Sequence, residues 1–217
     1  MATRRLVERV ALDDASWIDI GRGWLEGADE LYADLAVGVP WAQGRLWRYE
    51  RWVDEHRLGA PVSRVTGDGA AVLAATRREL VRRYRVDLGR GSMAWYRDGR
   101  DGMAFHRDRD LRYLDETVVA ILSLGGPRPF VLRPRAAYWA GARPAGAERS
   151  VTLCSGDLLV MGGRCQADWE HSVPRQHRLG VPGRISAQWR WTSGRGRPEQ
   201  GPSYRAPRTY RSSRLQG

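Results

Sequence analysis

The sequence contains no lysine and no asparagine, so all 36 of its basic residues are arginines. A strongly GC-biased genome produces this choice, and the arginine content alone therefore indicates no function. The excess of basic over acidic residues nevertheless gives a formal charge of +11 and a pI of about 10.6. A chain with this charge attracts polyanions, and nucleic acid is the partner that we expect.

Cysteines and long apolar runs are also scarce. The two cysteines, Cys154 and Cys165, form neither a disulfide framework nor a Cys-x-x-Cys metal site, and we expect both to be reduced in a cytoplasmic protein. No stretch approaches the roughly 18 apolar residues of a membrane span, and the N-terminus lacks the apolar core of a signal peptide. These features favour a globular monomer without a membrane partner, and 217 residues suffice for one domain with a sizeable core.

One of the four histidines, His106, lies two residues before Asp108. In an extended strand such residues share a face about 6.6 Å apart, so one imidazole and one carboxylate can approach a single ion. His171, from a distant strand, would complete the 2-His-1-carboxylate triad of non-haem Fe(II) enzymes. His-x-Asp alone is a weak signal. A lone histidine is more often an ordinary residue, as we expect for His56 and His177.

The stretch 183–191 alternates in polarity as a strand does. Arg184 and Arg190 lie on its polar face, about 20 Å apart along the strand, and side chains that lean toward each other leave a gap of a few ångströms. Guanidinium groups bind carboxylates through two parallel hydrogen bonds. The spacing therefore predicts a site for a short dicarboxylate.

Apolar periodicity predicts two helices, at 23–37 and 70–88, the second ended by Gly89. Short runs bounded by turn residues predict an edge strand at 5–10 and further strands at 92–96, around His106, and at 117–124, 130–133, 151–153, 157–161, 169–173 and 184–191. We expect the strands at 151–153 and 157–161 to pair with each other, and residues 59–69 and 136–149 to form loops. Eight or so short strands are what a jelly roll requires.

Between residues 40 and 58, tryptophans and tyrosines alternate with arginines. Aromatic rings stack on unpaired bases and arginines hold phosphates, although such rings also pack in cores and edge strands. In an extended segment Trp47 and Tyr49 share a face, which makes them candidates for contact with a base. Residues 192–217 hold six arginines against one glutamate and predict a disordered basic tail, either a solvated appendage or a source of non-specific affinity for nucleic acid.

Several motifs of the second half, taken together, resemble those of the AlkB-type Fe(II)/2-oxoglutarate-dependent dioxygenases. In chain order they are Tyr96-Arg97-Asp98-Gly99, His106-x-Asp108, Ser123-Leu124-Gly125, Gly156-Asp157-Leu158-Leu159-Val160-Met161, Trp169-x-His171 and Arg184-x5-Arg190. The resemblance covers about half of the chain. It implies a mainly β (α+β) fold: a double-stranded β-helix (jelly roll) with two supporting helices in the N-terminal half and a nucleotide-recognition lid. One domain would span 1–191, with the lid and its loop at about 40–69 and the catalytic core at about 92–191.

The resemblance also implies the reaction and its site. Fe(II), O2 and 2-oxoglutarate would be the cofactors, and N-alkylated bases such as 1-methyladenine and 3-methylcytosine, in single strands or flipped out of DNA or RNA, would be demethylated with release of formaldehyde, succinate and CO2, as in DNA repair. The implied roles are metal binding for His106, Asp108 and His171, catalysis for these three and Arg190, cosubstrate binding for Tyr96, Arg184, Ser186 and Arg190, and substrate binding for Trp47, Tyr49, Asp110 and Arg133.

Two positions depart from the pattern, because Ala94 and Ser186 stand where the family often has asparagine. Each missing amide removes a hydrogen bond worth about 1 kcal/mol, so we expect weaker binding of 2-oxoglutarate. Two alternatives stay open at this point. One is the same chemistry on a protein or a small molecule, and the other is a non-catalytic basic protein that binds nucleic acid.

Overall fold

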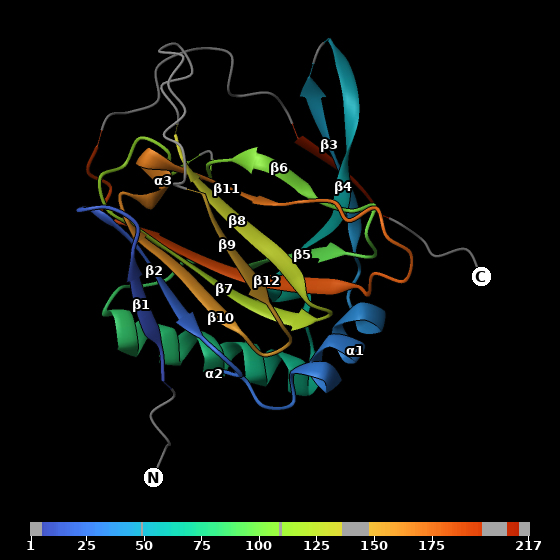
Figure 1. The fold of residues 1–217 in the computed structure, drawn as a ribbon. Helices are drawn as coiled ribbons and strands as arrows, with labels where there is room; N and C mark the ends of the chain where they lie inside the picture. The colour runs from blue at the N-terminus through green and yellow to red at the C-terminus, as the bar shows by residue number, and fades with distance from the viewer. Residues whose placement is uncertain (1–5, 49, 109, 136–147, 197–207, 213–217) are drawn as a thin grey trace.

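The computed structural model describes residues 6–48, 50–108, 110–135, 148–196 and 208–212, and these form two facing antiparallel sheets with two helices on one side (Figure 1). The strands are β1 (Glu8–Ala11), β2 (Ser16–Gly21), β3 (Ala42–Arg48), β4 (Arg51–Pro61), β5 (Ser92–Tyr96), β6 (Met103–His106), β7 (Thr117–Gly125), β8 (Arg128–Pro134), β9 (Arg149–Leu153), β10 (Leu158–Gly163), β11 (Trp169–Val173), β12 (Arg184–Thr192) and β13 (Arg208–Ser212). The helices are α1 (Ala28–Gly38), η1 (Val62–Arg64), α2 (Gly67–Tyr84) and α3 (Cys165–Asp168).

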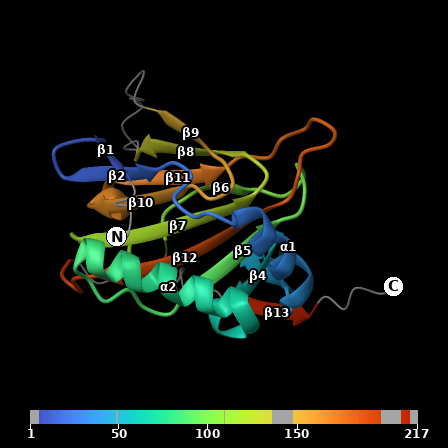
Figure 2. The same ribbon diagram turned by 90° about the horizontal axis from the view of Figure 1, so that it is seen from below.

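The described strands form a large sheet of order β1-β2-β10-β7-β12-β5-β4-β3-β13 and a small sheet of order β6-β11-β8-β9. This is the expected mainly β fold, a double-stranded β-helix. Helices α1 and α2 cover the outer face of the large sheet (Figure 2). No helix in the described part of the chain is long and apolar enough to cross a membrane.

Strand β7 shows how the core is divided. Its alternate residues Ala120, Leu122 and Leu124 pack in a cluster with residues of α1 and α2, whereas Val119 and Ile121 pack in a second cluster with residues of the small sheet. A strand buried on both faces needs apolar residues at successive positions, which is why 117–124 is a nearly continuous apolar run. Val119 and Ile121, on the inner face of β7, line the cavity between the sheets.

The helices begin and end at other residues than the periodicity predicts. Helix α2 starts at Gly67, so the expected loop 59–69 is largely structured: β4 continues to Pro61 and η1 follows. The helix ends at Tyr84 rather than at Gly89, because Arg85 adopts the left-handed conformation (φ 55°) and its N–H caps the carbonyl of Val81. Strand β2 was not predicted.

Two further predictions are wrong, one about strand pairing and one about the tail. Strands β9 and β10 do not pair with each other, because β9 pairs with β8 in the small sheet and β10 lies between β2 and β7 in the large one. The turn at Ser155-Gly156 therefore connects the two sheets. The second wrong prediction is the disordered tail, because Arg208–Ser212 forms strand β13. This strand pairs with β3 and satisfies backbone groups that would otherwise be unpaired at the edge of the sheet. Residues 197–207, 213–217 and most of the predicted loop 136–149 lie outside the described residues.

The segment predicted to be the lid is a β-hairpin. Strands β3 and β4 pair with each other, and β4 continues the large sheet through β5. The tip of this hairpin projects beyond the body of the molecule, at the end opposite α1 and α2 (Figure 1). That it covers a nucleotide stays a prediction.

Candidate metal centre and cosubstrate pocket

Two neighbouring strands of the small sheet bring the predicted ligands together. Strands β6 and β11 are antiparallel, and their register places His106 directly opposite His171. The two imidazole rings lie 4.2 Å apart between centroids. One ligand atom each of His106, Asp108 and His171 lies within 4.8 Å of the others, close enough to bind one ion.

Asp108 reaches this point by a route that the sequence pattern did not predict. Strand β6 ends at His106, so Asp108 lies in the segment that follows and does not share a strand face with His106. Its backbone N–H donates to Oε1 of the buried Gln166 at 2.8 Å, and this bond fixes the segment. Asp110, the implied substrate contact, is an exposed turn residue beyond this segment.

Each imidazole is oriented by a neighbour. Nδ1 of His106 lies 2.9 Å from the carbonyl of Ala104 and donates to it, which leaves Nε2 free to bind a metal, 4.0 Å from Oδ1 of Asp108. The ring of His171 stacks on Phe130 at 5.5 Å and 15°. Neighbours that hold the tautomer and the ring plane in this way are typical of metal-binding histidines.

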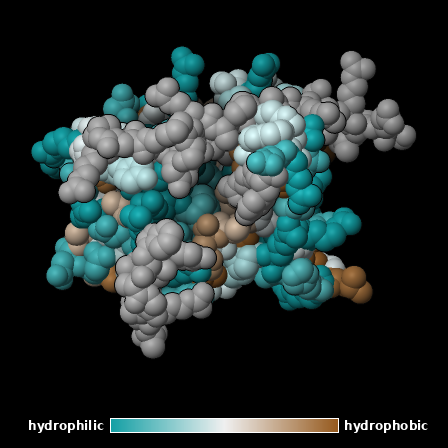
Figure 3. All heavy atoms as spheres, turned by 90° about the horizontal axis from the view of Figure 1, so that it is seen from above, coloured by the Kyte–Doolittle hydropathy of each residue, from teal (hydrophilic) through white to brown (hydrophobic). Residues whose placement is uncertain are grey.

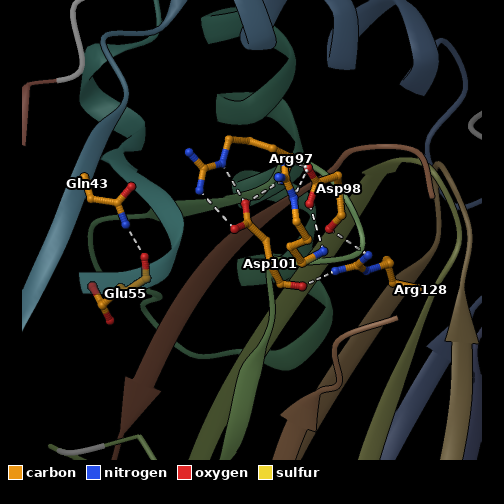
Figure 4. Close-up of polar contacts among 7 residues, drawn as sticks. Gln43, Glu55, Arg97, Asp98, Asp101 and Arg128 are labelled. Atoms are coloured by element: carbon orange, nitrogen blue, oxygen red, sulfur yellow. Dashed lines mark hydrogen bonds and ion pairs between the residues drawn. The ribbon is translucent and has the colours of Figure 1, made fainter. Parts of the chain in front are cut away.

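The turn that leads into β6 is also fixed (Figure 4). Arg97 forms an ion pair with Asp101 at 2.7 Å, and the buried Arg128 donates to the backbone carbonyls of Asp98 and Asp101. These contacts tie the start of β6 to β8, the strand beside β11. The direction in which His106 points is therefore set by both of its flanks.

The protonation states suit a cation. Burial lowers the pKa of both His106 and His171, the latter to about 3, so both rings are neutral near pH 7. Burial alone would raise the pKa of Asp108, but the Arg190 guanidinium and the two neighbouring imidazoles together outweigh burial and hold that pKa well below its usual range. Two neutral imidazoles and one carboxylate form the ligand set of non-haem Fe(II), with open positions left for other ligands.

Arg190 belongs to a chain of hydrogen bonds along the polar face of β12. Its Nε donates to Oδ2 of Asp108 at 2.7 Å, and its Nη2 donates to Oε1 of Gln188 at 2.6 Å. Nε2 of Gln188 in turn donates to Oγ of Ser186 at 3.0 Å. The face that the sequence assigned to the cosubstrate therefore also positions a candidate metal ligand.

Arg184 fits a carboxylate ligand. It is 1% exposed, its Nε donates to Oγ of Ser123 at 2.7 Å, and its Nη2 has no hydrogen-bond partner among the described residues. Tyr96 lies opposite Arg184 in the sheet register, with its ring centroid 5.8 Å from the guanidinium carbon. An unsatisfied buried donor is costly, and the far carboxylate of 2-oxoglutarate would satisfy it.

A cavity of about 1980 Å³ joins these groups and opens between the sheets. It is lined by the three candidate ligands, by Tyr96, Arg184, Ser186 and Arg190, and by Trp47, Asp110, Glu55 and Arg57 of the surrounding segments. The end of the molecule that carries the hairpin tip is mostly hydrophilic, with a few hydrophobic residues between (Figure 3).

The structure separates the four candidates for substrate binding. Trp47 lines the cavity, is 43% exposed and packs edge-on against Trp52, and Asp110 also lines the cavity. Arg133 does not line it, because its guanidinium binds Glu170 at 2.7 Å and lies over the ring of Phe105. Tyr49 lies outside the described residues.

His56 and His177 were expected to be ordinary residues without a role in metal binding. Both are exposed, and neither belongs to a metal-binding cluster within the described ranges. The sequence reasoning missed the roles of Gln166, Gln188 and Ser123, whose residue types carry no distinctive signal. Arg57, which lines the cavity, was recognisable only as one arginine of the aromatic and basic segment 40–58.

Comparison with known proteins identifies the family to which the chain belongs. Residues 91–214, more than half of the chain, match the 2OG-Fe(II) oxygenase superfamily. The alpha-ketoglutarate-dependent dioxygenase alkB homolog 3 of Mus musculus is 28% identical over 73% of this chain, and the human protein of that name is 28% identical over 71%. The chain spans 59% and 58% of their lengths. The DNA oxidative demethylase ALKBH2 of Arabidopsis thaliana is 31% identical over 37% of the chain and 31% of its own length.

Solved structures show the same fold at low identity. A prolyl hydroxylase from Trichoplax adhaerens, in complex with a hypoxia inducible factor peptide, superposes with a TM-score of 0.54 at 15% identity, covering 81% of this chain and 83% of that chain. HygX from Streptomyces hygroscopicus, solved with nickel and 2-oxoglutarate, gives 0.53 at 14% identity, covering 82% and 83%. From its sequence match, its jelly roll and its grouped His-Asp-His side chains, the chain belongs to the 2OG-Fe(II) oxygenase superfamily and is AlkB-like within it.

Proposed function

We propose that this chain is an Fe(II)/2-oxoglutarate-dependent dioxygenase that demethylates N-alkylated bases in nucleic acid. The observation that carries the proposal is the meeting of His106, Asp108 and His171 in a cavity that Arg184 and Arg190 also line. The net charge of +11 supports a polyanionic substrate. The relatives named as an alkB homolog and as a DNA oxidative demethylase support the same substrate class.

The ion, once bound with 2-oxoglutarate and oxygen, would supply the oxidation of the N-methyl carbon. The chain's own residues would prepare for it. Arg184 would bind the far carboxylate of the cosubstrate. Arg190 holds Oδ2 of Asp108, and Oδ1, which lies 4.0 Å from Nε2 of His106, would bind the ion. Apolar side chains of the cavity, including Val119, Ile121 and Phe130, would exclude water from the reacting groups.

Purified protein with Fe(II) and 2-oxoglutarate tests this on a panel of methylated single- and double-stranded DNA and RNA oligonucleotides, scored by mass spectrometry. We expect loss of the methyl group from at least one cationic methylated base, coupled to formation of succinate. The variant His106→Ala should abolish the loss, and the exposed His177→Ala serves as its matched control. If no oligonucleotide in the panel loses its methyl group, the result contradicts the proposal and points to a protein or small-molecule substrate.

A further inference from the structure

Three side chains form a row across the inner face of the large sheet. The register pairs Tyr96 of β5 with Arg184 of β12. It also pairs Trp95 of β5 with Leu58 of β4, and the next position along these two strands places Arg57 beside Tyr96. Leu58 and Trp95 pack in the cluster that contains residues of α1 and α2. Because strand residues alternate between faces, Arg57 and Tyr96 face the other side, where both line the cavity with Arg184.

Tyr96 is buried among guanidinium groups. It is 2% exposed, and the guanidinium carbons of Arg184 and Arg128 lie 5.8 and 5.9 Å from its ring centroid. The side chain of Arg57 is hydrogen-bonded to Tyr96. Burial lowers the pKa of the Arg57 guanidinium, but Tyr96 and Glu55 together outweigh burial and raise it, so this group stays charged.

The contact with Arg57 decides which way the Tyr96 hydroxyl donates. A guanidinium has only donors, so the hydroxyl oxygen accepts from Arg57 and keeps its own proton for another group. On the other side of Tyr96, Nη2 of Arg184 has no hydrogen-bond partner among the described residues. A carboxylate bound at Arg184 would therefore accept from the guanidinium and from the hydroxyl together.

The hairpin holds Arg57 in place. Its Nη2 lies 3.4 Å from Oε1 of Glu55, and the side chains of Arg57 and Glu55 are only 18% and 8% exposed. The side chain of Gln43 donates to the backbone carbonyl of Glu55 (Figure 4), and the N–H of Gly102 donates to the carbonyl of His56 at 2.9 Å. The two residues that precede Arg57 are thus bonded to the facing strand and to the turn before β6.

We propose that Arg57 is a positioning residue for 2-oxoglutarate: it holds the Tyr96 hydroxyl so that this group donates to the carboxylate bound at Arg184. Arg57 acts through Tyr96 and does not bind the cosubstrate itself. The affinity for 2-oxoglutarate therefore depends on a side chain of the hairpin. The inference rests on the cosubstrate part of the proposed function and is independent of the substrate.

A double-mutant cycle tests this, with Mn(II) in place of Fe(II) and calorimetric titration of 2-oxoglutarate. We expect Tyr96→Phe to weaken binding about tenfold, because one hydrogen bond to a charged group is lost, and Arg57→Met to weaken it about fivefold. The double variant should bind no more weakly than Tyr96→Phe alone, because without the hydroxyl Arg57 has nothing to position.

Two further substitutions test the direction of the hydrogen bond. Arg57→Lys can only donate and should restore most of the affinity, whereas Arg57→Gln should not, because its amide oxygen can accept the hydroxyl proton. The matched control is Arg51→Met, at an exposed position of the same strand, which should leave the affinity unchanged. Thermal unfolding without cosubstrate shows which variants are folded.

Additive losses in the double variant would mean that Arg57 acts independently of Tyr96, and wild-type affinity in Arg57→Met would mean that it has no role. Either result overturns the inference, as do equal affinities of Arg57→Lys and Arg57→Gln. A wild-type protein that does not bind 2-oxoglutarate contradicts the proposed function as well. A protein that binds 2-oxoglutarate as expected but demethylates no oligonucleotide contradicts only the proposed substrate.

Discussion

Arg184 illustrates, at the scale of single residues, a group kept for a ligand rather than for the fold. Burial lowers the pKa of its guanidinium to about 10, and no carboxylate pairs with it in the described part of the chain. An uncompensated buried cation costs stability, and apolar replacements of similar volume at such sites are often neutral or stabilising. Arg184 therefore lowers the stability of the cosubstrate-free protein but favours binding of the cosubstrate.

Arg184→Met tests this opposition. We expect the Tm of the cosubstrate-free protein to stay the same or rise, while the affinity for 2-oxoglutarate falls about a hundredfold, because two charge-assisted hydrogen bonds are lost. Thermal unfolding with and without 2-oxoglutarate, followed by calorimetric titration, measures both. The exposed Arg178→Met is the matched control. A variant that keeps the 2-oxoglutarate-induced rise in Tm would contradict this role.

Gln188 positions Arg190, which in turn holds Asp108. We expect Gln188→Leu to weaken the binding of Fe(II) or Mn(II) about tenfold, the lower end of the loss typical for groups that support a metal ligand, because Gln188 acts on Asp108 through Arg190. Gln188→Glu keeps an acceptor for Nη2 of Arg190 and should restore the affinity. Metal titration followed by tryptophan fluorescence distinguishes the two, and equal affinities for both variants would show that Gln188 is only structural.

The sequence predicted the residues that carry the strongest chemistry. His106, Asp108 and His171 were recognisable because their residue types and order are restrictive, and Arg184 and Arg190 because guanidinium groups on one strand face are. Gln166 and Gln188 were not recognisable, because an amide side chain carries no distinctive signal. The bond from Gln166 to the ligand segment also depends on packing between segments distant in the sequence.

The strands, one scale up, were predicted where the apolar pattern is strong: a nearly continuous apolar run in β7 and an alternation in β12. Errors occurred where neighbours decide. Strand β6 stops at His106, and the buried Gln166 binds the backbone N–H of Asp108 two residues further on, which no local pattern reveals. Strands β9 and β10 pair with neighbours in different sheets, β8 and β7, which the sequence of either strand does not reveal.

Strand β13 covers the outer edge of the hairpin. Ending the chain after Gly196 would expose the backbone groups of β3. We expect faster hydrogen exchange of amides in Ala42–Arg48, with a change of less than about 1 kcal/mol in global stability, because an edge strand contributes little to the core. Exchange measured by mass spectrometry on both lengths of chain tests this, with β7 amides as the internal reference. Unchanged exchange in β3 would contradict the pairing.

The charge of the whole molecule makes a separate prediction. A chain of net charge +11 that neutralises about four phosphates should lose about a hundredfold in affinity for an unmodified oligonucleotide between 50 and 200 mM salt. Anisotropy titrations at several salt concentrations give the slope. Affinity that does not depend on salt would mean that phosphates are not contacted, whatever the base pocket recognises.

His106 and His171 lie opposite each other on adjacent strands, and β6 is the edge of its sheet. An ion bound by both histidines would link β6 to β11, so separating β6 from the sheet would first require breaking a coordination bond. Deuterium uptake at the backbone of Met103–His106 should then report how many molecules in a sample are loaded, even for a spectroscopically silent metal.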